Sequence, residues 1–202
     1  MSEARLVIVD GAIASDDWTL LALPQLEETV RKQAGKVVLF RLTGEQTHAP
    51  EQLAAVAVPA GRVLVPLALW KLRKEALADR VAAREIGLCI DTHELVEDLV
   101  ESCAELNAFP VIAVRFERFA DGRGYSIASL LRTRYGYRGQ LRAVGDVLRD
   151  QLFLMKRCGF NAFAVRADRD IEVALAGLSD FSEPYQGAVD EPQPLWRRHA
   201  RG

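Results

Sequence analysis

The stretch that decides the fold is residues 116–166, FERFADGRGYSIASLLRTRYGYRGQLRAVGDVLRDQLFLMKRCGFNAFAVR. Two apolar, strand-like runs, 111–116 and 141–144, end in clusters of Asp, Gly and Arg. Each cluster leads directly into a segment with helical character. Because α/β proteins bind ligands at the carboxyl ends of their strands, the clusters mark the expected functional face.

The alternation of strand and helix continues on both sides of this stretch. Apolar runs separated by helices predict parallel strands with right-handed crossovers. We therefore predict an α/β fold whose repeated βα units form a mostly parallel sheet, similar to part of a (β/α) barrel. An open doubly wound sheet is the alternative. The expected strands are 63–65, 88–91, 111–116, 141–144 and 162–166, and the expected helices are 66–84, 93–106, 126–135, 147–158 and 171–178.

The two ends of the chain are less regular than this core, although at 202 residues a single domain is expected overall. Residues 1–60 form an N-terminal segment with expected strands at 5–10 and 36–42 and a short helix from Asp16 through Val30. The α/β core spans 61–182. The tail, 183–202, holds three prolines and no apolar periodicity, which predicts an extended or disordered arm.

The charge is distributed unevenly along the chain. Residues 115–169 hold 12 Lys and Arg against 5 Asp and Glu, whereas the whole chain holds 26 against 28. Such a basic segment can focus an anionic ligand or an acidic partner surface. Arginines that merely solvate helix faces are the alternative. We expect no nucleic-acid partner, because the chain as a whole is slightly acidic and has no recognisable binding motif.

Several cofactor and compartment classes lack their sequence signals. Three cysteines without a CxxC pair and three isolated histidines predict neither a disulfide framework nor a metal site. No nicotinamide, iron–sulfur or haem motif is present, while a flavin site, which needs no short motif, stays open. No apolar run is long enough to span a membrane, and the start of the chain does not resemble a signal peptide, so we expect a cytoplasmic protein.

The loop 120–126 is the sharpest candidate for a ligand site. Gly122 and Gly124 would let the backbone approach a ligand, and the helix that follows would offer free N–H groups to an anion. Arg123 could grip a small oxyanion such as sulfite through two hydrogen bonds. The alternative is a tight turn in which Arg123 pairs with a neighbouring carboxylate.

A charged residue inside an apolar strand needs a partner, and Arg142 is such a residue. We expect Asp121 or Asp146 to pair with it. Asp146 is either a helix cap or a general base. Cys158, at a helix end on the opposite face, is expected to be a buried structural residue. The candidate catalytic residues are Asp121 and Asp146, and the candidate binding residues are Arg115, Gly122, Arg123, Gly124, Tyr125, Ser126, Arg142 and Arg166.

Five short blocks carry a family resemblance: V-P-L-x-x-W at 65–70, D-G-R-G-Y-S at 121–126, L-R-A-x-G-D-V-L-x-D-Q at 141–151, R-C-G-F at 157–160, and Tyr185-Gln186. Together they resemble the bacterial domain-of-unknown-function family 934. Its members are often labelled as oxidoreductases of sulfite reduction, and their genes commonly sit beside those for assimilatory sulfite reductase. The resemblance implies an accessory role in sulfate and sulfite reduction.

Three functional hypotheses remain open, and whether the chain is an enzyme is undecided. The first is an accessory protein that binds a small oxyanion or sulfite reductase. The second is a barrel-type enzyme that acts on a small anionic substrate through Asp121, Arg123, Arg142 and Asp146. The third is a non-catalytic homo-oligomeric scaffold. The first two require these arginines and carboxylates to meet around one hollow.

Overall fold

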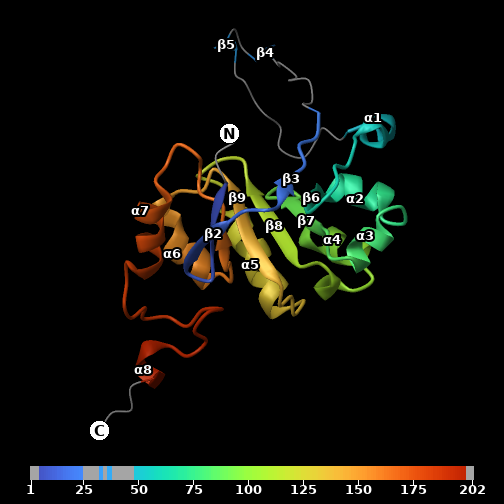
Figure 1. The fold of residues 1–202 in the computed structure, drawn as a ribbon. Coiled ribbons are helices and arrows are strands. Elements are labelled where there is room, and N and C mark those ends of the chain that lie inside the picture. Colours follow the sequence, from blue (N-terminus) through green and yellow to red (C-terminus); the bar gives the residue numbers. More distant parts are fainter. Residues whose placement is uncertain (1–4, 25–31, 34–35, 38–47, 199–202) are drawn as a thin grey trace.

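The computed structural model describes residues 5–24, 32–33, 36–37 and 48–198 (Figure 1). Its centre is an eight-stranded sheet with the strand order β2-β1-β10-β9-β8-β7-β6-β3. Neighbouring strands from β10 to β3 are parallel, whereas β1 is antiparallel to β10 and to β2. The strands are β1 (Leu6–Val9), β2 (Ala12–Ser15), β3 (Thr19–Leu20), β6 (Val63–Pro66), β7 (Ile86–Asp91), β8 (Val111–Phe116), β9 (Gln140–Gly145) and β10 (Ala162–Phe163).

The sheet curls into a half-barrel, which confirms the predicted partial-barrel α/β fold (Figure 1). The short connection between the two edge strands shows that the sheet is curled. The edge strand β2 ends at Ser15 and the opposite edge strand β3 begins at Thr19. Four residue steps reach at most about 14 Å, far less than the width of a flat sheet of eight strands spaced about 4.8 Å apart. The two edges therefore lie close together.

Helices follow the strands and supply the cover for one face of the sheet. The helices are α1 (Pro50–Ala55), α2 (Leu67–Arg73), α3 (Ala78–Ala82), α4 (Val96–Ser102), α5 (Arg123–Thr133), α6 (Arg149–Arg157), α7 (Ile171–Ala176) and α8 (Leu195–Arg198), with 3₁₀ turns at Leu106–Ala108 and Gly177–Ser179. A separate antiparallel pair consists of β4 (Lys32–Gln33) and β5 (Lys36–Val37). Within the described part of the chain, no helix is both long and apolar enough to cross a bilayer.

The two faces of the sheet have different cores, because successive side chains of a strand point to opposite faces. On one face, residues such as Leu88, Ile112 and Leu141 pack with side chains of α2, α4, α5, α6 and α7. On the other face, a smaller cluster of strand residues packs around Trp18. Trp18 belongs to the segment that joins the two edges, so this second face is the inner face of the half-barrel.

The inner face also holds Arg142, which is 2% exposed. The expectation that Asp121 or Asp146 pairs with it is wrong. Its guanidinium donates to the Asp16 carboxylate at 2.7 Å, across 126 residues of sequence. Asp16 lies in the joining segment, so the ion pair ties that segment to β9.

The N-terminal segment differs most from expectation. Thr19–Leu20 is a strand where a helix through Val30 was predicted, and residues 25–30 lie outside the described ones. Of the predicted strand 36–42, β5 covers Lys36–Val37, and the rest also lies outside the described residues. Asp10 and Gly11, both with positive φ, form a two-residue hairpin turn between β1 and β2, for which Asp-Gly is a favoured pair.

Two further local predictions need correction. The predicted helix 66–84 is two short helices, α2 and α3, separated by a turn. A glycine that follows a predicted helix and precedes a predicted strand is typical of a left-handed helix cap, as are Gly87, Gly136 and Gly159. Gly136 and Gly159 have the positive φ angle of such a cap, but Gly87 lies inside β7, and Arg84 has the left-handed conformation instead. Gly87 has a packing role: a Cβ there would lie 2.7 Å from the Leu64 side chain.

The tail is extended apart from α8, and it is tied to the end of α6. The backbone N–H of Val189 donates to the carbonyl of Arg157 at 3.0 Å. The Arg157 guanidinium donates to the carbonyl of Gln186 and lies 3.5 Å from the Asp190 carboxylate. Tyr185 and Trp196 remain more than half exposed.

Candidate functional site

The carboxyl ends of β7, β8, β9 and β10 lie side by side at one end of the sheet. This end is here called the carboxyl-end rim, and it consists of residues 91–94, 115–124, 145–147 and 165–168. The strands are parallel and in register, with Asp91 opposite Arg115 and Phe116 opposite Gly145. Segments as far apart in sequence as Asp91 and Arg166 therefore lie at the same end of the sheet. This is the end at which α/β barrels and sheets bind their ligands.

Arg115 is paired with Asp91 on the neighbouring strand. Its Nε and one terminal nitrogen each donate to a different Asp91 oxygen at 2.5 Å. This two-point geometry is the strongest arrangement that an arginine and a carboxylate adopt. Glu117 lies 4.0 Å from the same guanidinium. Arg115 is therefore already occupied by a carboxylate.

Arg123 is paired within its own loop. Its side chain donates to both oxygens of Asp121, at 2.9 and 2.6 Å, and its backbone N–H donates to Asp121 at 3.1 Å. The Thr92 hydroxyl from the loop after β7 also donates to Asp121, at 2.6 Å. The hydrogen bonds from Arg123 hold the pKa of Asp121 well below its usual range. The loop is thus the tight, internally paired turn that was the alternative to an open anion site.

Asp146 and Arg166 form the third ion pair of the rim, at 2.9 Å. Asp146 also accepts a bond from the backbone N–H of Phe119 at 2.9 Å. Its interpretation as a helix cap is wrong, because α6 has Leu148 as its N-cap, whose N–H donates to the Gln151 side chain. Arg166 makes two further bonds to Asp168.

The remaining residues of the 120–126 loop serve packing. A Cβ at Gly124 would lie 2.4 Å from the ring of Phe116, so the helix α5 can approach β8 only with glycine there. Gly122 has open space around it. Tyr125 packs edge-on against Phe116, with ring centroids 5.7 Å apart. Ser126 is exposed on α5. The close contact at Gly124 is therefore made by the protein's own core.

The predicted convergence is only partial. Asp121 and Arg123 lie together, and Asp146 is joined to their loop through the Phe119 backbone. Arg142 lies apart from them, buried on the inner face with Asp16.

One group of rim residues escaped sequence reasoning. Asp91, His93 and Glu117 offer one ligand atom each, and these atoms lie within 4.8 Å of one another. A lone histidine without a paired His or Cys gives no sequence signal for a metal site. Asp91 ends the expected strand 88–91 and Glu117 directly follows the expected strand 111–116, so the tendency of strand ends to carry ligand sites is the signal that could have found the group.

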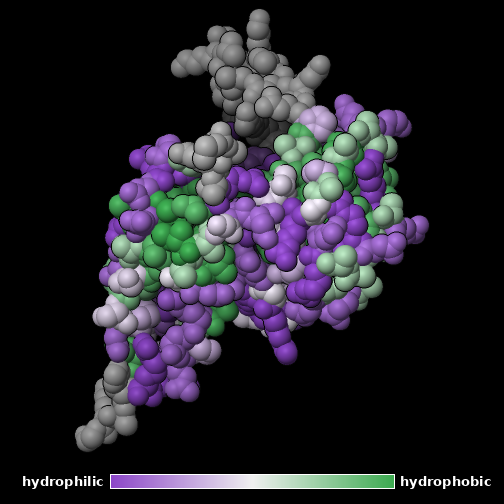
Figure 2. All heavy atoms as spheres, viewed as in Figure 1, coloured by the Kyte–Doolittle hydropathy of each residue, from purple (hydrophilic) through white to green (hydrophobic). Residues whose placement is uncertain are grey.

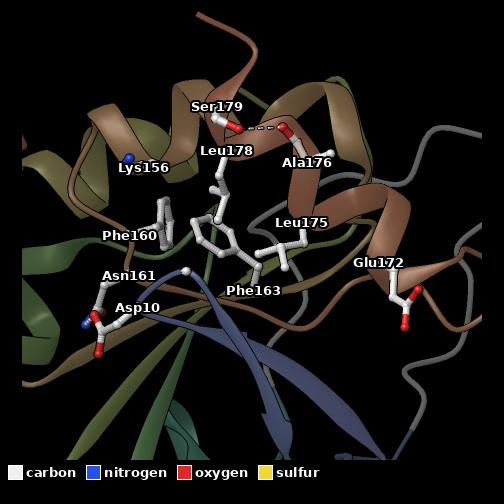
Figure 3. A pocket seen from close by; sticks show the side chains of 11 residues that line it. Asp10, Lys156, Phe160, Asn161, Phe163, Glu172, Leu175, Ala176, Leu178 and Ser179 are labelled. Carbon is white, nitrogen blue, oxygen red and sulfur yellow. Dashed lines mark hydrogen bonds between the residues drawn. The ribbon is translucent and has the colours of Figure 1, made fainter. Parts of the chain in front are cut away.

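A cleft lies at the other end of the sheet, beside α6 and α7 (Figure 3). Its volume is about 630 Å³, and Phe160, Phe163 and Leu178 form apolar walls. Figure 2 shows hydrophobic side chains gathered over this part of the molecule. Cys158, at the end of α6, is partly buried, and this burial raises the pKa of its thiol. No predicted site residue lines the cleft.

The comparisons with known proteins bear on more than half of the chain. The family described as "Bacterial protein of unknown function (DUF934)" matches residues 87–196, which include the whole carboxyl-end rim. No curated protein and no solved structure matches the chain. The match agrees with the resemblance carried by the short blocks of the sequence. Because the matched region covers more than half of the chain, the chain belongs to this bacterial family of unknown function.

Proposed function

We propose that this protein is an accessory protein of assimilatory sulfite reduction and that it binds sulfite reductase through the carboxyl-end rim. Family membership alone does not specify an activity. The link to sulfite reduction comes from the genes that commonly neighbour those of the family. The rim supports the choice of a protein partner, through one exposed aromatic side chain.

That side chain is Phe119, which is 44% exposed at the tip of the loop after β8. Its backbone is fixed on both sides: the N–H donates to Asp146 at 2.9 Å, and the carbonyl accepts from Gln151 at 3.1 Å. Aromatic and arginine side chains dominate binding at protein interfaces. A partner that covers a fixed aromatic ring loses little conformational entropy in the process. Phe119 is the observation that carries the proposal.

Arg118 strengthens the same surface. It is exposed beside Phe119 and has no hydrogen bond or ion pair from its side chain to any residue that the structure describes. An acidic patch on a partner can therefore pair with it without breaking an internal contact. The alternating charges around it can guide the orientation of a partner surface.

A free oxyanion has less support than a protein partner. Arg115, Arg123 and Arg166 each hold a carboxylate, so a small anion would have to displace an internal ion pair. The hydrogen bonds from Arg123 hold the pKa of Asp121 well below its usual range, which gives less support to acid–base chemistry by that carboxyl. Asp146 already accepts bonds from Arg166 and from the Phe119 N–H.

The test measures the affinity of the purified full chain for purified sulfite reductase. We expect Phe119→Ala to weaken binding at least tenfold and Arg118→Ala to weaken it less. Phe181→Ala is the matched control, since Phe181 is 65% exposed on a different part of the molecule. Equal losses for the two phenylalanine variants would contradict the assignment of the surface.

A genetic test addresses the pathway. A deletion strain should grow poorly on sulfate and normally on sulfide, and the wild-type chain, but not Phe119→Ala, should restore growth on sulfate. Normal growth of the deletion strain on sulfate, with no physical association, would refute the proposal. Calorimetric binding of sulfite by the isolated chain, without association, would favour the oxyanion function instead.

A further inference from the structure

We propose that Asp91, His93 and Glu117 bind a divalent transition-metal ion, such as Zn²⁺ or Mn²⁺, at the carboxyl ends of β7 and β8. This inference is independent of the proposed partner. It rests on the arrangement of donor atoms, on their freedom to bind and on the charge that surrounds them.

The donor atoms are close to the separations that a metal ion requires. Nitrogen and oxygen ligands lie about 2.0–2.2 Å from Zn²⁺, so two ligands of one ion are at most about 4.4 Å apart. The atoms of Asp91, His93 and Glu117 lie within 4.8 Å of one another. Small side-chain rotations are enough to close the remaining gap. The backbone needs no movement, since β7 and β8 are hydrogen-bonded neighbours.

Each donor has capacity left for a metal. The His93 ring makes no hydrogen bond with the described residues, and the nearest cation to the Glu117 carboxylate is 4.0 Å away, at Arg115. The Asp91 oxygens each accept one bond from Arg115 and keep a second lone pair. Arg115 thereby fixes the orientation of Asp91, as hydrogen-bonded neighbours of metal ligands usually do.

The surroundings are short of positive charge. Asp91, Glu94 and Glu117 carry three negative charges when ionised, and Arg115 supplies one positive charge among them. Lys71, the next cation near Glu94, is paired with Asp98 at 2.6 Å. A divalent ion would balance the group.

Cys89 lies beneath the three donors. It precedes Asp91 by two residues and is therefore on the same, inner face of β7. Its side chain is 3% exposed and packs with the apolar cluster around Trp18. A buried free cysteine behaves as a small hydrophobic residue, so Cys89 gives the donors an apolar floor.

The donor types select the class of ion. Imidazole suits Zn²⁺, Fe²⁺ and other transition metals, whereas Mg²⁺ and Ca²⁺ prefer sites built of oxygen alone. One imidazole with two carboxylates therefore favours Zn²⁺ or Mn²⁺ over Mg²⁺. Three protein ligands would leave at least one coordination position for water or for a small anion.

The test is calorimetric titration of the untagged full chain, stripped with chelator, with Zn²⁺, Mn²⁺ and Mg²⁺ in turn. We expect one Zn²⁺ or Mn²⁺ per chain and at least tenfold weaker binding in both His93→Gln and Glu117→Gln. Neither side chain makes a hydrogen bond with the residues that the structure describes, so both variants should keep the wild-type melting temperature without metal. His48→Gln and Asp168→Asn are the matched controls and should bind as the wild type does.

Three results would each overturn the proposal. The first is the absence of Zn²⁺ and Mn²⁺ binding by the folded wild-type chain. The second is unchanged affinity in both His93→Gln and Glu117→Gln, which would place the ion elsewhere. The third is tighter binding of Mg²⁺ than of Mn²⁺, which would refute the class of ion.

Discussion

The interior of the half-barrel and its carboxyl-end rim are both held by arginine–aspartate pairs, yet the pairs lie in opposite environments. In the interior, the side chains of Arg142 and Asp16 are 3% and 11% exposed. At the rim, the Arg123 side chain is 49% exposed, although its partner Asp121 is 15% exposed. The shortest nitrogen–oxygen distances of the two pairs, 2.7 and 2.6 Å, are similar, and the pairs differ chiefly in the access of water.

That difference separates charges that the fold must keep paired from charges that water can solvate. A charge inside the barrel must be paired, because an unpaired one would carry a large desolvation cost. A charge at the rim that loses its partner can be solvated by water at little cost. Substitutions in the interior and at the rim should therefore differ mainly in how much they lower the stability of the fold. Their difference in effect on binding should be smaller.

The largest expected effect comes from removing the interior partner. Asp16→Ala leaves Arg142 buried without a counter-charge, and we expect a loss of about 3 kcal/mol or more in the free energy of unfolding. The neighbouring Asp17→Ala is the matched control, because Asp17 pairs with Arg62 where both side chains are more than half exposed. It should cost less than about 1 kcal/mol. Urea denaturation at pH 7 measures both.

A double variant tests whether the loss of stability comes from the unpaired charge of Arg142. Adding Arg142→Met to Asp16→Ala removes the stranded charge, so the double variant should be more stable than Asp16→Ala alone. If instead the double variant is less stable, or if Asp16→Ala and Asp17→Ala cost the same, the interior pair does not have the assigned role.

Sequence reasoning succeeded where contacts are local or periodic. The apolar run 111–116 became β8 with the same bounds, and the pattern of strands and helices gave the parallel sheet. The pairing of Arg123 was among the alternatives because its partner Asp121 is only two residues away. Local propensity and hydrophobic periodicity carry this information without knowledge of the fold.

It failed where the fold brings distant residues together. Asp16 is 126 residues from Arg142 in the sequence. The segment that holds Asp16 leads into β3, a strand of only two residues. No periodicity is visible in so short a strand, so nothing in the sequence marks Asp16 as an interior residue. The group of Asp91, His93 and Glu117 depends in the same way on the register of β7 against β8.

Replacing Gly124, which packs against Phe116 at the rim, is expected to have an intermediate effect on stability. Gly124→Ala would place a methyl group 2.4 Å from the Phe116 ring, and such overpacking costs about 1–3 kcal/mol. Gly122→Ala, with nothing within 4 Å, is the control in the same loop and should change stability by less than about 1 kcal/mol. Thermal denaturation distinguishes them. A ligand-approach role for Gly124 would predict unchanged stability in both.

The smallest effect concerns acid and the exposed pair of the rim. The bonds from Arg123 depress the pKa of Asp121 in the folded protein, whereas the unfolded chain has the ordinary value of about 3.9. The unfolded state therefore takes up the proton first as the pH falls. The contribution of Asp121 to stability is present above about pH 4 and is lost as the pH drops towards the folded-state pKa.

Asp121→Asn should therefore destabilise the protein at pH 7 by no more than about 1 kcal/mol, because solvent screens a pair whose arginine is half exposed. The difference in the free energy of unfolding between Asp121→Asn and the wild type, measured by urea denaturation, should become smaller as the pH falls from 5 to 2.5. Glu75→Gln, at an exposed position without a side-chain hydrogen bond to the described residues, should show no gap at any pH. A gap for Asp121→Asn that stays constant with pH would mean that its charge does not stabilise the fold, and the rim pair would then lose the contrast with the interior one.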